Sequence, residues 1–352
     1  MGNIIDIYET DSTVILNEAV DQYKVKALWA LYSGGHDSLV STHIASKHPL
    51  FRGVIHVNTK TSPLAQKVTE YARDTAKANG WTFIEVSPFI TYTQIIVKNG
   101  FPSPDVHNYV YQYLKGRPIK QAVQHAKAKL IHELTNGKSG EIKFDTSGEN
   151  AGSLTFVKPT MSRKELNAVK RTAVIGLVSG MRHAESKRRS KLPPSGKQDG
   201  NIWINPIIEW SKERCSEYIN SNNLLRNRVS DVTGVSNECD CKCHAAPDEL
   251  SIQSRIMPNM NDYANKLQEL VRVSRELQLM EVQFGMRNPD DVIDIHDTVW
   301  GHGRKSTKVV TAESMPLFSI CSVCEGQLDT QGNVGVDPDL MMLAAQMTKR
   351  KA

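Results

Sequence analysis

The chain lacks any long hydrophobic run. No apolar stretch in its 352 residues approaches the roughly 20 residues that a helix needs to cross a bilayer. Residues 1–11 contain acids and lack the basic region and the apolar stretch of a secretory signal. We therefore expect a cytoplasmic protein with no membrane partner.

A strong excess of one charge sign is also missing. The net charge of +5 at pH 7 suits anionic ligands but does not require nucleic acid. Cysteine is sparse, and five of the six cysteines fall into two groups, Cys239/Cys241/Cys243 and Cys321/Cys324. Inside cells, such cysteines bind metals or take part in catalysis more often than they form disulfides. Cys215 stands alone in a helical pattern and is predicted to lie in the core.

A Ser/Gly loop joins an apolar strand to a helix at residues 33–38. The run reads Ser33-Gly34-Gly35-His36-Asp37-Ser38 and lacks the Gly-Lys-Ser/Thr ending of a Walker A loop. Its glycines let the backbone approach an anion closely, and the free N–H groups of the helix start point at that anion. The hydroxyls of Ser33 and Ser38 add donors, and Asp37 can cap the helix or hold Mg²⁺. The loop therefore predicts a phosphate cradle.

The first half of the chain alternates strand and helix patterns. Such alternation is typical of a doubly wound parallel sheet, so we predict a three-layer α/β/α fold with a mainly parallel, twisted sheet. We expect strands at 25–32, 53–58, 81–86 and 172–179, and helices at 37–47, 63–79, 105–113, 118–134 and 162–171. A polar stretch at 136–160 reads as an insertion or mobile loop that contains a short hairpin.

After Pro206 the alternation of strand and helix patterns ends, and the remaining patterns are helical or irregular. We expect helices at 211–220 and 261–284, with an irregular segment at 222–238 between them. The predicted organisation is a nucleotide-binding domain at 1–206, an α-rich, cysteine-bearing region at 207–335 and a polar tail at 336–352.

A second polar constellation follows the strand expected at 172–179. It reads Gly180-Met-Arg182-His-Ala-Glu185-Ser186-Lys-Arg-Arg189. Ligands bind at the carboxyl ends of strands in open α/β sheets, which is where this segment falls. The guanidinium forks of Arg182, Arg188 and Arg189 suit phosphate or sulfate oxygens, and Glu185 can orient one of them.

These two segments resemble one known family. The loop at 33–38 resembles the PP-loop, Ser-Gly-Gly-x-Asp-Ser, of ATP pyrophosphatases and phosphoadenosine-phosphosulfate (PAPS) reductases, with His36 where relatives often have lysine. The segment at 180–189 resembles the Gly-x-Arg-x-x-Glu-Ser-x-x-Arg run of PAPS reductases. The resemblance implies an adenine nucleotide alpha hydrolase-like fold that binds ATP or PAPS with Mg²⁺. It also implies nucleotide contacts from Ser33, Gly34, Gly35, His36, Asp37, Ser38, Gly180 and Arg182, and catalytic roles for Asp37, Arg182, Glu185 and Arg189.

The cysteine groups add a metal prediction. Thiolates at Cys-x-Cys and Cys-x-x-Cys spacing can chelate one soft centre, and the predicted ligands are Cys239, Cys241, Cys321 and Cys324, with Cys243 left over. Adenylylsulfate reductases with a [4Fe-4S] cluster have a similar layout, although with Cys-Cys in place of Cys-x-Cys. The segments Glu238-Cys239-x-Cys241, Asp248-Glu249-Leu250 and Trp300-Gly301-x-Gly303, with the Cys-x-x-Cys pair, resemble phage reductase-like proteins and the ATP pyrophosphatases of DNA phosphorothioation. A [4Fe-4S] cluster, Zn²⁺ and reduced, unliganded thiols all remain open.

Two reactions follow from the resemblance. PAPS reductases need a nucleophilic thiolate, which the family carries in a C-terminal Glu-Cys-Gly-Ile-His-like segment, whereas no cysteine follows Cys324 here. We therefore predict an enzyme that cleaves the α–β phosphate bond of ATP to activate an acceptor, in sulfur transfer or nucleic-acid modification. The expected partners are DNA or RNA as acceptor and a sulfur donor protein. The alternatives are a PAPS or adenylylsulfate reductase and a non-catalytic nucleotide-binding subunit.

Overall fold

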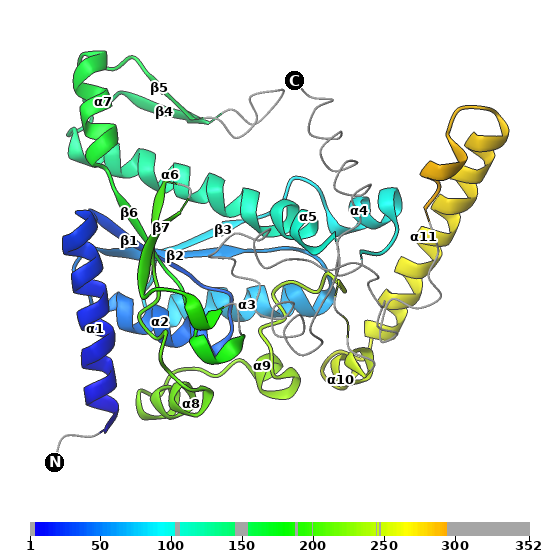
Figure 1. Cartoon of the computed structure of the whole chain (residues 1–352), viewed down its shortest axis with the longest axis horizontal. Helices are drawn as coiled ribbons and strands as arrows, with labels where there is room; N and C mark the ends of the chain where they lie inside the picture. Colours follow the sequence, from blue (N-terminus) through cyan, green and yellow to red (C-terminus); the bar gives the residue numbers. More distant parts are fainter. Residues whose placement is uncertain are drawn as a thin grey trace.

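The protein is built around a mainly parallel β-sheet. The computed structural model describes residues 4–102, 106–144, 154–186, 189–198, 200–243, 245 and 248–293. Within these residues, the strands of the main sheet lie in the order β3-β2-β1-β6-β8-β7. Only β7 runs antiparallel to its neighbour, β8, and the other pairs are parallel. The predicted α/β fold with a mainly parallel sheet is confirmed (Figure 1).

The four predicted strands lie close to their predicted positions; β1, β3 and β6 are shorter than predicted, and β2 begins two residues earlier. The strand bounds are β1 Ala27–Leu31, β2 Phe51–Val57, β3 Phe83–Val86, β6 Ile175–Val178, β7 Ser195–Gln198 and β8 Asn201–Ile204. Every residue of β1 is buried, which is expected for a central strand covered on both faces. The hairpin of β7 and β8 was not predicted, since its four-residue strands give too short a pattern to recognise.

Helices cover both faces of the sheet. Leu28 and Ala30 of β1 pack in one hydrophobic cluster with α1 (Ile4–Tyr23), α2 (His36–Ser46), α3 (Pro63–Ala78) and α8 (Lys212–Ser221). Trp29 and Leu31 face the opposite cluster, with α6 (Arg117–Leu134) and α7 (Arg163–Thr172). Figure 1 shows α6 on one side of the sheet and α2 and α3 on the other. This arrangement makes the predicted three layers.

Local capping explains several helix starts. Ser62 accepts a hydrogen bond from the Ala65 N–H at the start of α3, with Pro63 as the first helical residue. The predicted capping box of Ser162 and Glu165 is present and begins α7. The helices predicted at 105–113 and 118–134 are instead joined, because a π-helical turn (Gln112–Gly116) connects α5 (His107–Tyr111) to α6.

Four further helices, α1, α4, α9 and α10, correct the sequence-based expectations. The segment 222–238, expected to be irregular, contains α9 (Arg228–Thr233), which Asn227 caps and Gly234 ends in the left-handed conformation. Neither α4 (Tyr92–Asn99) nor α10 (Glu249–Ile256) was predicted, because eight residues carry little periodicity. The predicted long amphipathic helix is present as α11 (Met260–Gln283). N-terminal α1 also went unpredicted.

The polar insertion contains a β-hairpin. Strands β4 (Glu141–Phe144) and β5 (Leu154–Val157) pair antiparallel within the predicted 136–160 segment. The division of the chain at residue 206 stays a prediction, and Trp210, Cys215 and Tyr218 beyond it pack into the cluster that holds β1 and α2. Cys215 is therefore a core residue, as expected. In the described part of the chain, no helix is long and apolar enough to cross a membrane.

Candidate active site

The phosphate cradle predicted at 33–38 lies between the end of β1 and the start of α2. A chain of hydroxyl contacts fixes it: the Gly35 N–H donates to Ser33 Oγ at 3.2 Å, Ser33 Oγ lies 2.9 Å from Ser38 Oγ, and Ser38 Oγ donates to the Gly35 carbonyl at 2.9 Å. Gly34 has a φ of +82°, and a Cβ there would lie 2.8 Å from Val68 Cγ1. Glycine is required at that position by both conformation and space.

The first turn of α2 is open to an anion. Its N-cap residue is Gly35, and no side chain among the described residues caps the first-turn amides. Uncapped N–H groups and the positive end of the helix dipole favour a negatively charged ligand. Asn227, the N-cap residue of α9, donates to the Gly34 carbonyl at 2.8 Å and ties this loop to the region after the sheet.

The segment after β6 packs directly onto this helix start. A Cβ on Gly180 would lie 2.6 Å from the Asp37 carbonyl carbon and 2.7 Å from the Ser38 nitrogen. Nearby, Arg182 Nη2 donates to Asp37 Oδ2 at 2.9 Å. Glu185 accepts from the Arg182 backbone N–H at 3.0 Å and forms an ion pair with Arg189. The two sequence segments therefore form one polar site.

A cavity of about 260 Å³ lies between these segments. Three cationic side chains line it, namely Arg182, Arg189 and Lys212, against the carboxylates of Asp37 and Glu185. Two of the residues that line the cavity also carry a buried donor, Arg182 Nε and the Ser230 hydroxyl, that has no hydrogen-bond partner in the described part of the chain. Buried donors need partners, and the phosphate oxygens of a ligand would supply them.

The structure brings together almost all of the residues predicted to bind the nucleotide or to act in catalysis. Of the predicted nucleotide contacts, all but Gly34 line the cavity, and all four predicted catalytic residues line it. The cavity also includes residues that sequence reasoning missed, among them Lys212, Ser216, Ser230 and Ser236. Lys212 is the first residue of α8 and follows the N-cap residue, Ser211. A lysine at a helix start, just after the Trp210 segment, is the sequence signal that could have identified it as a site residue.

His36 stands where relatives often carry lysine. Burial lowers the pKa of His36 although the nearby Asp231 carboxylate opposes this. The imidazole is therefore neutral at pH 7, and its Nε2 lies 3.5 Å from Asp231 Oδ1. A neutral ring supplies no charge to a phosphate, so the cationic contacts of the cavity come from the arginines and Lys212.

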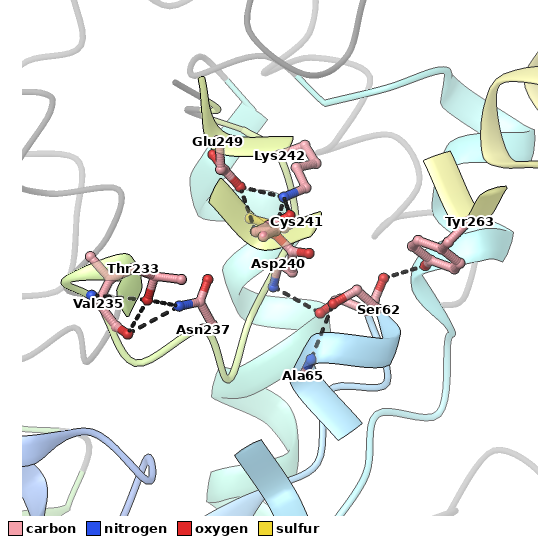
Figure 2. Close-up of polar contacts among 12 residues, drawn as sticks. Ser62, Ala65, Thr233, Val235, Asn237, Asp240, Cys241, Lys242, Glu249 and Tyr263 are labelled. Atoms are coloured by element: carbon pink, nitrogen blue, oxygen red, sulfur yellow. Dashed lines mark hydrogen bonds and ion pairs between the residues drawn. The ribbon is translucent and has the colours of Figure 1, made fainter. Parts of the chain in front are cut away.

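The first cysteine group lies on a buried loop that crosses the end of the sheet. The Asp240 N–H donates to Thr61 Oγ1 at 2.8 Å, and the Tyr92 hydroxyl donates to the Cys241 carbonyl at 2.8 Å. Lys242 pairs with Asp240 and Glu249. Figure 2 shows Asp240, Cys241 and Lys242 held between Glu249 and the loop before α3.

Two of these cysteines meet a histidine. The ligand atoms of His107, Cys241 and Cys243 all lie within 4.8 Å of one another, and all three residues are buried. Of the four predicted metal ligands, Cys241 belongs to this group, the half-buried Cys239 does not, and Cys321 and Cys324 lie outside the described residues. Cys243 was left over in the prediction, and His107 is too distant in sequence to be recognised. The predicted [4Fe-4S] cluster, alternatively Zn²⁺, stays a prediction.

The chain also matches a known protein family. Residues 27–231, more than half of the chain, match the phosphoadenosine phosphosulfate reductase domain. The chain belongs to this family. The matched segment contains both halves of the cavity, from Ser33 to Arg189, and ends before the cysteine loop.

Individual members of the PAPS reductase family and related structures are distant. The phosphoadenosine 5'-phosphosulfate reductase of Buchnera aphidicola subsp. Acyrthosiphon pisum (strain 5A) is 24% identical over 132 residues, 37% of this chain. The matched part spans 51% of that reductase, so the chain matches about half of its length.

Two solved structures are also similar. The PAPS reductase of Candida auris, in its phosphate complex, has 18% identity and a TM-score of 0.38, with 64% of this chain and 89% of that chain covered. The U34-tRNA thiolase NcsA of Methanococcus maripaludis, with its [4Fe-4S] cluster, has 12% identity and a TM-score of 0.33, with 77% and 80% covered.

Proposed function

We propose that this member of the PAPS reductase family binds ATP in the cavity between β1 and β6 and cleaves the α–β phosphate bond to adenylate an acceptor. The observation that carries the proposal is the cavity itself. It combines an uncapped helix start, a rigid Ser/Gly loop and three cationic side chains at the carboxyl ends of parallel strands.

Each group of residues in the cavity has its own role in the proposed reaction. The amides at the start of α2 and the loop hydroxyls would hold the departing pyrophosphate, since they present several donors to one anion. Arg182 and Arg189 would neutralise the charge that develops on the phosphates. Glu185 orients both arginines, because it accepts from the Arg182 backbone and pairs with the Arg189 guanidinium.

The chemical step needs no protein nucleophile. An acceptor oxygen forms a bond to the α-phosphorus while the bond from that phosphorus to the bridging oxygen breaks, and pyrophosphate leaves with the electron pair. Asp37 is the carboxylate placed to hold a Mg²⁺ ion, which would screen the phosphate charge. In the structure Asp37 pairs with Arg182, so the same carboxylate sets the position of that guanidinium.

ATP is favoured over PAPS because the described part of the site offers no reactive thiolate. Among the described residues no cysteine lines the cavity. Cys215 lies close behind it, but only 1% of its surface is exposed, and burial raises the pKa of its thiol well above the usual range. A thiol that stays protonated and inaccessible cannot attack sulfur.

The acceptor we favour is a nucleic acid, with sulfur supplied by a donor protein. The support is the resemblance of the cysteine region to the ATP pyrophosphatases of DNA phosphorothioation. Reduction of PAPS or adenylylsulfate is the second candidate, and the family match supports it. A nucleotide-binding subunit without turnover is the third.

One product analysis separates the three. The full chain is incubated with Mg²⁺ and ATP, with and without DNA or RNA, and in parallel with PAPS and a dithiol reductant. The proposal predicts AMP and pyrophosphate from ATP, and no sulfite from PAPS. Sulfite production would support the reductase instead, and binding of ATP without any product would support the non-catalytic subunit. Asp37→Asn serves as the matched inactive control.

A further inference from the structure

We propose that His107, Cys241 and Cys243 bind a single zinc ion, which anchors the cysteine loop beside the nucleotide cavity. The inference does not depend on the proposed reaction, because metal binding is measured without turnover. It shares only Cys241 with the ligand set predicted from the sequence, adds His107 and Cys243, and commits to Zn²⁺, one of the centres that the sequence left open.

The geometry suits one ion. In a tetrahedral zinc site with Zn–S near 2.3 Å and Zn–N near 2.0–2.1 Å, the ligand atoms lie roughly 3.5–4 Å apart. The ligand atoms of the three residues lie within 4.8 Å of one another, so small side-chain rotations would close the site. The thiolates of a [4Fe-4S] cluster bind different irons and stand further apart than ligands of the same ion. A mixed set of imidazole and thiolates is also typical of zinc.

The loop is preorganised to present both thiols. Residues 241 and 243 are two positions apart, and Lys242 between them has a φ of +59°, a conformation that costs a non-glycine residue about 1–2 kcal/mol. The side chain of Lys242 is completely buried and forms ion pairs with Asp240 of the same loop and with Glu249, the first residue of α10. The hydrogen bond from Tyr92 fixes the Cys241 carbonyl. Strain of this kind is retained where a site needs a fixed geometry.

The third ligand comes from a different element. His107 is the first residue of α5 and is 2% exposed. Val110 and Tyr111 of the same helix belong to the hydrophobic cluster that contains Cys241, Cys243 and Met260 of α11. A zinc ion would therefore tie the loop to α5. It would also neutralise two buried thiolates, which are otherwise costly in an apolar environment.

The anchored loop leads into the wall of the nucleotide cavity. Gly234, Val235 and Ser236 line that cavity just before the loop begins. Ser236 touches the phosphate loop, since a Cβ on Gly35 would lie 2.9 Å from Ser236 Cβ. The zinc ion would thus act as a positioning element for one wall of the cavity.

The first test measures zinc in the full-length protein purified from medium that contains both zinc and iron. We expect one zinc per chain, and X-ray absorption at the zinc edge should show sulfur near 2.3 Å together with nitrogen near 2.0–2.1 Å. An iron–sulfur spectrum, an all-sulfur zinc shell or a protein without metal would each overturn the proposal. This measurement needs no variant and so does not depend on the folding of one.

The second test uses matched variants and chelator competition. Cys243→Ser and His107→Ala should weaken zinc binding by more than the roughly 10–100-fold that loss of an outer-shell partner costs. Cys239→Ser and His125→Ala, one neighbouring cysteine and one histidine outside the group, should keep the zinc affinity of the parent. Loss of zinc in Cys239→Ser with retention in His107→Ala would contradict the assignment.

Discussion

Replacement of Gly180 by alanine should damage the nucleotide cavity more than it damages the fold. A Cβ at this position would lie 2.6 Å from the Asp37 carbonyl carbon, 2.7 Å from its oxygen and 2.7 Å from the Ser38 nitrogen. All three atoms belong to the backbone, so either the end of β6 or the first turn of α2 must move. Overpacking of this kind typically costs about 1–3 kcal/mol of unfolding free energy.

The same displacement separates the two halves of the site. Arg182 follows Gly180 by two residues, and its 2.9 Å contact to Asp37 crosses the junction that the methyl group would open. If half of the cost falls on nucleotide binding, about 0.5–1.5 kcal/mol, the ATP affinity drops by about 2- to 12-fold, since 1.4 kcal/mol corresponds to a factor of ten. Calorimetric titration with ATP and Mg²⁺ measures the affinity, and urea denaturation measures the stability.

Gly200→Ala is the matched control. Gly200 lies in the β7–β8 turn, at the amino end of β8, whereas the cavity lies at the carboxyl ends of the parallel strands. Its φ is +75°, and no atom of the described residues lies within 4 Å of an added Cβ. Alanine at this position costs only the free energy of the left-handed backbone conformation, about 1–2 kcal/mol. We expect similar destabilisation but unchanged ATP affinity. Equal ATP affinities for Gly180→Ala and the parent would refute the argument that close packing at Gly180 builds the cavity.

Three further predictions concern single side chains. Arg182→Met should weaken ATP binding by about 2 kcal/mol, roughly 30-fold, because a charged donor to phosphate is lost. Arg163→Met, at the exposed start of α7, should leave ATP binding unchanged, and calorimetric titration with ATP measures both variants. Cys215→Ala should lower the free energy of unfolding by about 1 kcal/mol yet leave ATP cleavage unchanged, and a loss of turnover would show that this thiol takes part in the chemistry. Burial lowers the pKa of His56 to about 4. Between pH 7 and pH 4 the unfolded state therefore takes up a proton that the folded state does not bind, and the free energy of unfolding should fall by about 3 kcal/mol as the pH is lowered through that range. Denaturation at several pH values, with His56→Asn flattening the dependence, checks the last prediction.

The parts of the fold that the sequence predicts are those with strong local signals. The strand at β1, the cap and proline of α3 and the capping box of α7 each carry their signal within a few residues. The short helices α4 and α9 and the β7–β8 hairpin have too few residues for a period to emerge, and tertiary packing decides their conformation.

The candidate site divides in the same way. The loop at 33–38 and the Arg182–Arg189 segment are contiguous motifs, so their residue types and spacing indicate their chemistry. Lys212, Ser230 and Ser236 reach the cavity from α8, α9 and the following turn, and nothing in their own neighbourhood marks them. His107 meets Cys241 only through the folding of α5 over the cysteine loop, across more than a hundred residues.

Hydrogen exchange tests the central claim, that this cavity binds the phosphates of an adenine nucleotide. Amide exchange of the full chain is compared with and without ATP and Mg²⁺, in peptides that cover 33–38 and 180–186. Bound phosphates would engage the amides at the start of α2, so we predict slower exchange in both peptides and unchanged exchange in the β4–β5 hairpin. ATP binding that protects neither peptide would place the nucleotide elsewhere and contradict the account.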